Sequence, residues 1–238
     1  MSENVSPRVF APDLLIQGFE PPLQLSSFKA IAFDMDSTLI NIECIDEIAD
    51  AVGKKAEVAA ITEAAMRGEI TDFKDSLRRR VALLQGVPAE ALQEVYDTRL
   101  KLNPGATELL AAARSAGLHA LLVSGGFTFF ADRVRERLGM HEAHANTLEI
   151  EGGLLTGRVL GDIVDGEAKK QHLLALCTRL QCDPKLSIAV GDGANDLPMM
   201  GVSGLSVAYH AKPKVREQAM IAINTGGLDR VLEVLTLV

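Results

Sequence analysis

Four short apolar runs, separated by stretches of helical character, limit what this chain can fold into. The runs cover residues 30–33, 118–123, 186–190 and 205–208. Runs of this length without polar alternation are typical of strands that are buried on both faces of a parallel sheet. Between them, apolar residues recur at three- and four-residue spacing, over 104–116, 127–138 and 167–180. The sequence therefore predicts an α/β fold built from βαβ units.

Such units place the functional groups of different strands at one edge of the sheet. Right-handed crossovers put the carboxyl end of every parallel strand on the same side, and open α/β sheets bind ligands there. The residues that directly follow each apolar run are therefore the candidates for function.

A long helical stretch interrupts this alternation between the first and second runs. Residues 43–102 are far too many for an ordinary βα connection, so we expect an inserted helical cap over 42–103. Gly53, Gly68 and Gly86 should separate its helices, and Thr71 and Pro88 should each mark a helix start.

The rest of the chain divides around this cap. The predicted catalytic core comprises 28–41 and 104–238, and within it residues 148–160 alternate around two glycines, which predicts an inserted β-hairpin. Residues 1–27 contain four prolines among scattered apolar residues, so we expect an irregular N-terminal arm packed on the surface.

Composition and charge exclude several classes of protein. The chain has 238 residues and a net charge of −8, which disfavours sequence-independent binding to nucleic acid or to anionic lipid. Without a spanning-length apolar stretch or a signal-peptide pattern, we expect a cytoplasmic protein with no membrane partner. The cysteines Cys44, Cys177 and Cys182 form no Cys-x-x-Cys pair, so we expect buried or idle thiols. The sequence leaves open whether the protein is a monomer or a homodimer.

Acidic residues follow two of the apolar runs. Asp34 and Asp36 follow the first in the motif DMDST, and Asp192, Asn195 and Asp196 follow the third in GDGAND. The acids of the first motif equally suit a turn in which they bond only the backbone, and Asn195 or Asp196 equally suits a helix cap. The second motif lacks the spacing and terminal Glu of an EF-hand loop.

A hydroxyl and two glycines follow the second run. Ser124, Gly125 and Gly126 offer unobstructed donors to a phosphate oxygen. If all three loops share one edge, several carboxylates and a phosphate would crowd together, each like-charge pair costing ~1 kcal/mol in water and more in a cleft. Such a site requires cations, and Mg²⁺ fits because it binds carboxylate and phosphate oxygens together. Lys169 can add a second positive charge, although its spacing equally suits a solvated helix residue.

These motifs together resemble those of the haloacid dehalogenase superfamily, and within it the group that hydrolyses phosphoserine. FDMDSTL, VSGGF, the pair Ala168-Lys169 and VGDGAND stand in the order and approximate spacing of that superfamily, and the likeness covers about residues 28–236. The resemblance implies a three-layer Rossmann-like core with sheet order 3-2-1-4-5, in which the strands bearing Asp34, Ser124 and Asp192 are adjacent.

The resemblance also implies catalytic and metal-binding roles. Asp34 would be the nucleophile, and Asp36 the general acid and base. Asp34, the main-chain carbonyl of Asp36, and Asp192 would hold Mg²⁺. The implied activity is hydrolysis of O-phospho-L-serine to serine and phosphate through an aspartyl phosphate, the last step of serine biosynthesis.

Further residues correspond to phosphate-binding and supporting positions. By resemblance, Ser124, Gly125 and Lys169 would bind the phosphoryl group. Asn195 would lie beside the substrate and the metal, and Asp196 would support Lys169.

The predicted cap carries candidates for substrate selection. Phe73 belongs to an apolar helical stripe, and Arg80 lies beside that stripe, whereas its two neighbouring arginines point toward solvent. Glu43 either favours the dipole of the first cap helix or faces the site. If Glu43 and Arg80 both face the site, they can hold an ammonium and a carboxylate, with Met66 and Phe73 closing the apolar sides.

Two other functions are compatible with the same motifs. A phosphotransferase would pass the phosphoryl group to another alcohol such as homoserine. A catalytically idle module would bind only phosphoserine or metal, because fold alone does not establish turnover. Possession of both Asp34 and Asp36 argues against the idle module.

Overall fold

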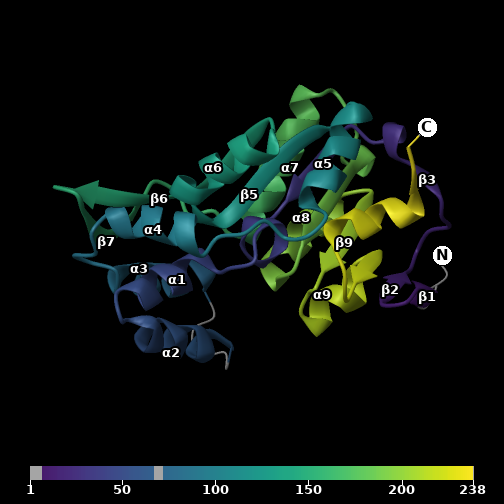
Figure 1. Ribbon diagram of the computed structural model, residues 1–238. Coiled ribbons are helices and arrows are strands. Elements are labelled where there is room, and N and C mark those ends of the chain that lie inside the picture. The colour runs from purple at the N-terminus through teal and green to yellow at the C-terminus, as the bar shows by residue number, and fades with distance from the viewer. Residues whose placement is uncertain (1–6, 67–71, 238) are drawn as a thin grey trace.

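A nine-stranded, mostly parallel sheet forms the centre of the molecule. The computed structural model describes residues 7–66 and 72–237 (Figure 1). The strand order is β1-β2-β10-β9-β8-β4-β5-β6-β7. The parallel strands are β6 (Glu142–Glu151), β5 (His119–Phe127), β4 (Ala30–Phe33), β8 (Ser187–Gly191), β9 (Leu205–Tyr209) and β10 (Ile221–Ile223). Numbering the first five along the chain gives 3-2-1-4-5, so the predicted order is confirmed, with β10 as an additional parallel strand.

Helices cover both faces of this sheet, as the apolar runs require. Ile31 and Phe33 of β4 pack on one face, against α5 (Ala106–Ser115) and α6 (Thr128–Leu138). Ala30 and Ala32 pack on the other, with side chains of α7 (Gly166–Arg179), α8 (Leu197–Val202) and α9 (Pro213–Gln218). Every residue of β4 is 0% exposed, which confirms the three-layer core with a strand buried on both sides.

The inserted cap is helical, as predicted. It contains α1 (Cys44–Ala51), α2 (Lys55–Met66), α3 (Phe73–Ala82) and α4 (Glu90–Thr98), which lie together at one end of the molecule (Figure 1). Gly53 and Gly86 separate helices as expected, whereas Gly68 and Thr71 fall outside the described residues. The N-cap of α3 is Asp72, whose carboxylate accepts the Lys74 N–H at 3.0 Å. Pro88 lies two residues before α4.

The predicted hairpin forms but belongs as much to the cap as to the core. β6 and β7 (Leu154–Leu160) pair antiparallel around Gly152 and Gly153. Leu155 then exchanges backbone hydrogen bonds with the loop between α3 and α4, receiving one from Gly86 N–H and giving one to Val87 O, both at 2.8 Å. The alternation of residues predicted the hairpin. It did not predict the pairing with the cap, because that pairing joins segments that are distant in sequence.

The expectation of an irregular N-terminal arm is wrong for its described part. β1 (Arg8–Ala11) and β2 (Leu14–Ile16) form a hairpin, and β2 pairs antiparallel with β10. The short β3 (Leu23–Gln24) pairs with β11 (Leu235–Thr236). The prolines are compatible with these strands because they lie outside them: Pro12 lies between β1 and β2, and Pro21 and Pro22 precede β3. Within the described parts of the chain, no helix has the length and apolar character to cross a membrane.

Candidate active site

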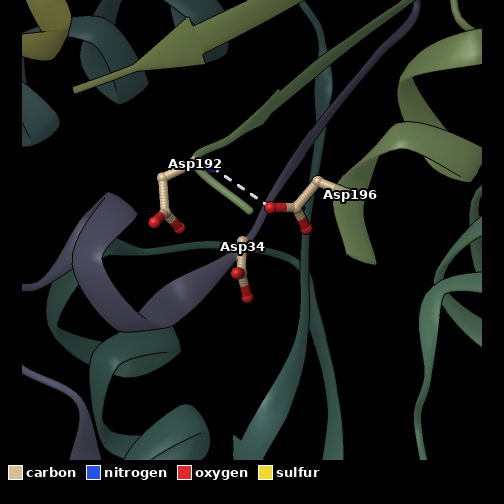
Figure 2. Close-up of side chains that lie close together, drawn as sticks. All are labelled: Asp34, Asp192 and Asp196. Carbon is tan, nitrogen blue, oxygen red and sulfur yellow. Dashed lines mark hydrogen bonds between the residues drawn. The ribbon is translucent and has the colours of Figure 1, made fainter. Parts of the chain in front are cut away.

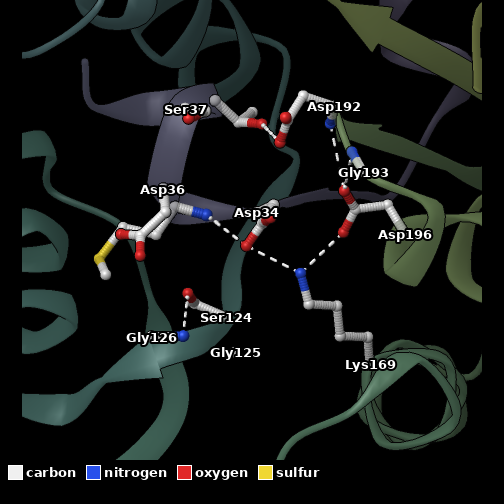
Figure 3. Close-up of polar contacts among 12 residues, drawn as sticks. Asp34, Asp36, Ser37, Ser124, Gly125, Gly126, Lys169, Asp192, Gly193 and Asp196 are labelled. Atoms are coloured by element: carbon white, nitrogen blue, oxygen red, sulfur yellow. Dashed lines mark hydrogen bonds and ion pairs between the residues drawn. The ribbon is translucent and has the colours of Figure 1, made fainter. Parts of the chain in front are cut away.

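The three motif loops meet at the carboxyl edge of the sheet. β4 lies between β5 and β8, with Phe33 in register with both Leu122 and Val190. Asp34, Ser124 and Asp192 therefore come from adjacent strands, as predicted, and they surround one small volume (Figure 3). The Asp34 N–H donates to Val190 O at 3.0 Å, which ties the first loop to the neighbouring strand.

One oxygen of Asp34 is fixed by two donors. Oδ1 accepts hydrogen bonds from Met35 N–H at 2.7 Å and from Lys169 Nζ at 2.8 Å. Among the described residues, none donates a hydrogen bond to Oδ2 of Asp34. The side chain is nearly buried and lines the cavity, so the carboxylate is oriented with one oxygen held and the other free to act as a nucleophile.

Lys169 is a buried cation between two carboxylates. Its Nζ lies 2.8 Å from Asp34 Oδ1 and 2.7 Å from Asp196 Oδ1, and the side chain is 0% exposed. Burial lowers the pKa of the ammonium, but Asp196 and Asp34 outweigh it, so the pKa is raised above its ordinary value. Lys169 is therefore charged at neutral pH, and the solvated-helix interpretation is excluded.

Asp196 organises the third loop. Its Oδ2 accepts the N–H groups of Asp192 at 3.1 Å and Gly193 at 3.0 Å (Figure 3). A Cβ at Gly191 would lie only 2.3 Å from that same oxygen, which explains a glycine at this position. Because its other oxygen bonds Lys169, Asp196 connects the loop to the cation.

Asp36 is held by the start of the first cap helix. Its Oδ2 accepts Cys44 N–H at 3.2 Å, and its Oδ1 contacts Cys44 Sγ at 3.1 Å. Burial, followed by the negative charge of Glu43, raises the pKa of Asp36 to about 7. A carboxyl group with this pKa can both donate and accept a proton near neutral pH. Cys44 is a buried free thiol, as the prediction of buried or idle thiols allows, and its backbone and side chain both contact Asp36.

The acids form a cluster that suits a hard cation. Asp34, Asp192 and Asp196 each offer a carboxylate oxygen within 4.8 Å of the others (Figure 2). Burial and the charge of Asp196 raise the pKa values of Asp34 and Asp192, in the latter case to about 7, because Lys169 only partly offsets them. A divalent cation would balance this charge, so the donor set fits a metal bound by oxygen ligands.

The residues expected to bind phosphate differ in local structure from the prediction. Ser124 and Gly125 lie within β5, which continues to Phe127, rather than in a loop before the helix. The register with β6 is interrupted between Val123 and Phe127, as in a bulge. The Gly126 N–H donates to Ser124 Oγ at 2.9 Å, which leaves the Ser124 hydroxyl hydrogen for another acceptor.

Asn146, on β6, fixes this segment and was missed by sequence reasoning. Its Nδ2 donates to Gly125 O at 2.8 Å, and its Oδ1 accepts Val164 N–H at 2.8 Å. The residue is 1% exposed. Asn146 thereby joins the Ser124 segment to the loop that leads into α7 and Lys169. Its amide gave no signal in the sequence, because it lies in a strand rather than in a motif loop.

Replacing Asn146 with Ala should lower the free energy of unfolding by about 2–4 kcal/mol, because two buried backbone groups lose their partners. Denaturant unfolding measures the change. Asn224→Ala is the matched control, since among the described residues the Asn224 side chain makes a single hydrogen bond, a 3.3 Å contact from Arg216. Equal, small effects of both substitutions would contradict a structural role for Asn146.

The cap closes over these groups and leaves a cavity of about 350 Å³. Nearly all of the predicted site residues line it, namely Asp34, Asp36, Glu43, Phe73, Arg80, Ser124, Gly125, Asp192 and Asn195. Lys169 and Asp196 are buried beside it. Met66 ends α2, but its side chain lies outside what the structure describes.

The predicted cap residues occupy different positions in the cavity wall. A Cβ on Gly125 would lie 2.9 Å from the Phe73 ring, so this ring packs directly on the Ser124 segment. Arg80 is partly buried, whereas Arg78 and Arg79 are exposed, as the helical periodicity predicted. Glu43 is the N-cap residue of α1 rather than part of its first turn, and it makes no capping bond. Its Oε1 instead accepts the Ser37 hydroxyl at 2.7 Å.

Several cavity residues gave no recognisable sequence signal. Asp46 and Lys212 line the cavity without belonging to a motif. Lys74 lies 3.1 Å from Asp165, an ion pair that joins α3 of the cap to the N-cap of α7. Such contacts depend on how the cap is placed on the core, which periodicity does not specify.

The fold and its acidic cluster match those of a known family of hydrolases. The model of the haloacid dehalogenase-like hydrolase family matches residues 31–201. The phosphoserine phosphatase of a Polaromonas species is 64% identical over 233 residues, which cover 96% of this chain and 99% of the relative. The phosphoserine phosphatase of Vibrio cholerae is 48% identical over 206 residues, covering 87% of this chain and 62% of the relative.

Solved structures agree with these relatives. A substrate-bound phosphoserine phosphatase complex superposes with a TM-score of 0.82 at 38% identity, covering 88% of this chain and 99% of that one. A phospho-aspartyl intermediate analogue of phosphoserine phosphatase gives the same values. The chain therefore belongs to the haloacid dehalogenase-like hydrolases and, within them, to the phosphoserine phosphatase family.

Proposed function

We propose that this protein hydrolyses O-phosphoserine to serine and phosphate through a phosphorylated Asp34. The observation that carries the proposal is the fixed Asp34 carboxylate, with Oδ1 bound by Lys169 and Met35, beside a protonatable Asp36. The names of its relatives and the substrate-bound structural neighbour support phosphoserine as the substrate.

The reaction consists of two displacements at phosphorus. Asp34 attacks and forms an oxygen–phosphorus bond, while the bond to the serine oxygen breaks and Asp36 gives that oxygen its proton. Asp36 then accepts a proton from water, whose oxygen attacks the phosphorus and releases Asp34 and phosphate. Lys169 and the Ser124 hydroxyl stabilise the negative charge of the transferred group.

A magnesium ion fits the acidic cluster. Asp34, Asp192 and the main-chain carbonyl of Asp36 would hold it, because both oxygens of Asp196 already accept hydrogen bonds. When bound, it would neutralise the carboxylates and the phosphoryl oxygens.

The cap supplies the basis for substrate selection. Arg80 lines the cavity. Among the described residues its one hydrogen bond is a long 3.4 Å contact from Nε to Ser76 O, which leaves its terminal nitrogens available to a carboxylate. Glu43 provides negative charge for an ammonium, and Phe73 closes an apolar side. Together these groups match a small zwitterionic phosphate ester.

A substrate panel with and without Mg²⁺ tests this proposal. Phosphoserine should be hydrolysed with the highest kcat/KM among phosphoserine, phosphothreonine and phosphohomoserine, and a chelator should abolish turnover until Mg²⁺ is restored. No phosphate release from any of the three with Mg²⁺ present would refute the hydrolase assignment. Phosphoryl transfer to added homoserine in preference to water would establish the phosphotransferase instead.

The first displacement should slow as pH rises through about 7. The raised pKa of Asp36 means that its proton, required for the leaving serine oxygen, is lost over this range. The second displacement needs the ionised form and should show the opposite trend. Single-turnover measurements separate the two steps, and in Asp36→Asn neither inflection should appear. A first step that accelerates with pH would contradict this assignment of Asp36.

A further inference from the structure

One carboxylate oxygen in the cavity wall lacks a hydrogen-bond partner. Asp46 lies in the first turn of α1 and lines the cavity together with Glu43 and Arg80. Among the buried side-chain atoms of the described residues, Asp46 Oδ1 is the one without a hydrogen-bond partner. An unsatisfied buried acceptor costs about 1–3 kcal/mol, and more when it is charged.

The neighbouring cation does not satisfy this oxygen. Although both residues belong to the described part of the chain, Arg80 donates no hydrogen bond to Asp46 Oδ1. Burial raises the pKa of Asp46, and the charge of Arg80 offsets this only in part. Asp46 is nevertheless the acid whose charge acts most strongly on Arg80, ahead of Glu43 and Asp36. Both side chains line the same cavity, which a ligand can enter.

The chemistry of an amino acid matches that arrangement. Its ammonium and carboxylate are attached to the same carbon, so their protein partners must also be neighbours. If Arg80 holds the carboxylate, an acid with an unsatisfied oxygen in the same cavity wall can hold the ammonium. Glu43 already accepts the Ser37 hydroxyl at 2.7 Å, and an ammonium has three donors that can serve more than one carboxylate.

We propose that Asp46 binds the ammonium group of the substrate together with Glu43 and so determines specificity for an amino-acid phosphate ester. This inference rests on the proposed function and refines its substrate selection. Alternatively, Asp46 only positions Arg80. The two roles predict opposite losses of kcat/KM for an ester that has only the ammonium and for an ester that has only the carboxylate.

Three phosphate esters separate these roles. Phosphoserine has both the ammonium and the carboxylate, phosphoethanolamine has only the ammonium, and the phosphate ester of 3-hydroxypropanoate has only the carboxylate. Asp46→Asn should lower kcat/KM about 10- to 100-fold for the first two, the loss expected for a hydrogen bond to a charged group, and change the third less than about threefold.

Other patterns overturn the proposal. Losses for the two carboxylate-bearing esters but not for phosphoethanolamine would mean that Asp46 positions Arg80. Equal losses for all three would mean a structural role. Asp50→Asn is the matched control, since Asp50 lies one turn further along α1, outside the cavity and bonded to Arg99, and should leave all three rates unchanged.

Two further measurements keep the result interpretable. Asp46→Ser removes the charge with a smaller side chain and must give the same pattern of losses as Asp46→Asn. The test therefore does not depend on the folding of a single variant. The wild-type protein is tested first. If it shows no preference for phosphoserine over the ester without an ammonium, the proposed function itself fails. A retained preference that survives Asp46→Asn would instead refute only the role of Asp46.

Discussion

Replacing Asp34 with Asn should reduce turnover by at least ~10⁴-fold, the scale of loss when a catalytic nucleophile is removed. The amide keeps the shape of the side chain but cannot form the oxygen–phosphorus bond. Steady-state phosphate release with saturating phosphoserine and Mg²⁺ measures the change. Lys169 would retain its contact with Asp196, so the variant should remain folded.

Asp162→Asn is the matched control for this substitution. Asp162 is exposed and lies outside the cavity, so its replacement should leave the rate unchanged. Turnover by Asp34→Asn that remained within about tenfold of the wild-type rate would contradict nucleophilic catalysis by this residue.

Replacing Lys169 with Met should cause the largest loss of stability, about 3–5 kcal/mol of the free energy of unfolding. The substitution leaves Asp34 and Asp196 buried without their shared cation. Denaturant unfolding measures the loss, and catalysis should fall as well because the phosphoryl group loses a positive partner.

Two further variants establish the cause. Lys170→Met is the matched control, because Lys170 is the next residue on α7 and, within the described residues, pairs only with Glu167. Its replacement should change stability by less than about 0.5 kcal/mol. Adding Asp196→Asn to Lys169→Met should recover at least about 1 kcal/mol, because one uncompensated charge is removed. Strictly additive losses would show that the ion pair is not the source of the effect.

The strands and motif loops could be predicted because their signals are local. Ala30–Phe33 is apolar on both faces, and the residue that follows such a strand must emerge at the edge of the sheet. Asp34, Ser124 and Asp192 each follow such a run, so the sequence alone predicts that they lie together. Helical periodicity likewise distinguished Arg80 from its two neighbours.

The remaining features depend on contacts between distant segments. Asn146 acts through Gly125 and Val164, which approach it only in the folded chain. Cys44 bonds Asp36 because α1 begins beside the first loop. The pairing of the β6–β7 hairpin with the cap also depends on tertiary contacts. So does the pairing of β2 with β10, which forms although the N-terminal segment is rich in proline.

Trapping of the phosphorylated protein tests the central claim most directly. Rapid acid quenching during turnover of phosphoserine labelled in its phosphoryl group should yield labelled protein that loses its label to hydroxylamine, with the label mapping to the peptide that contains Asp34. Turnover that proceeds at the normal rate without any labelled protein, or with the label on another residue, would contradict the mechanism.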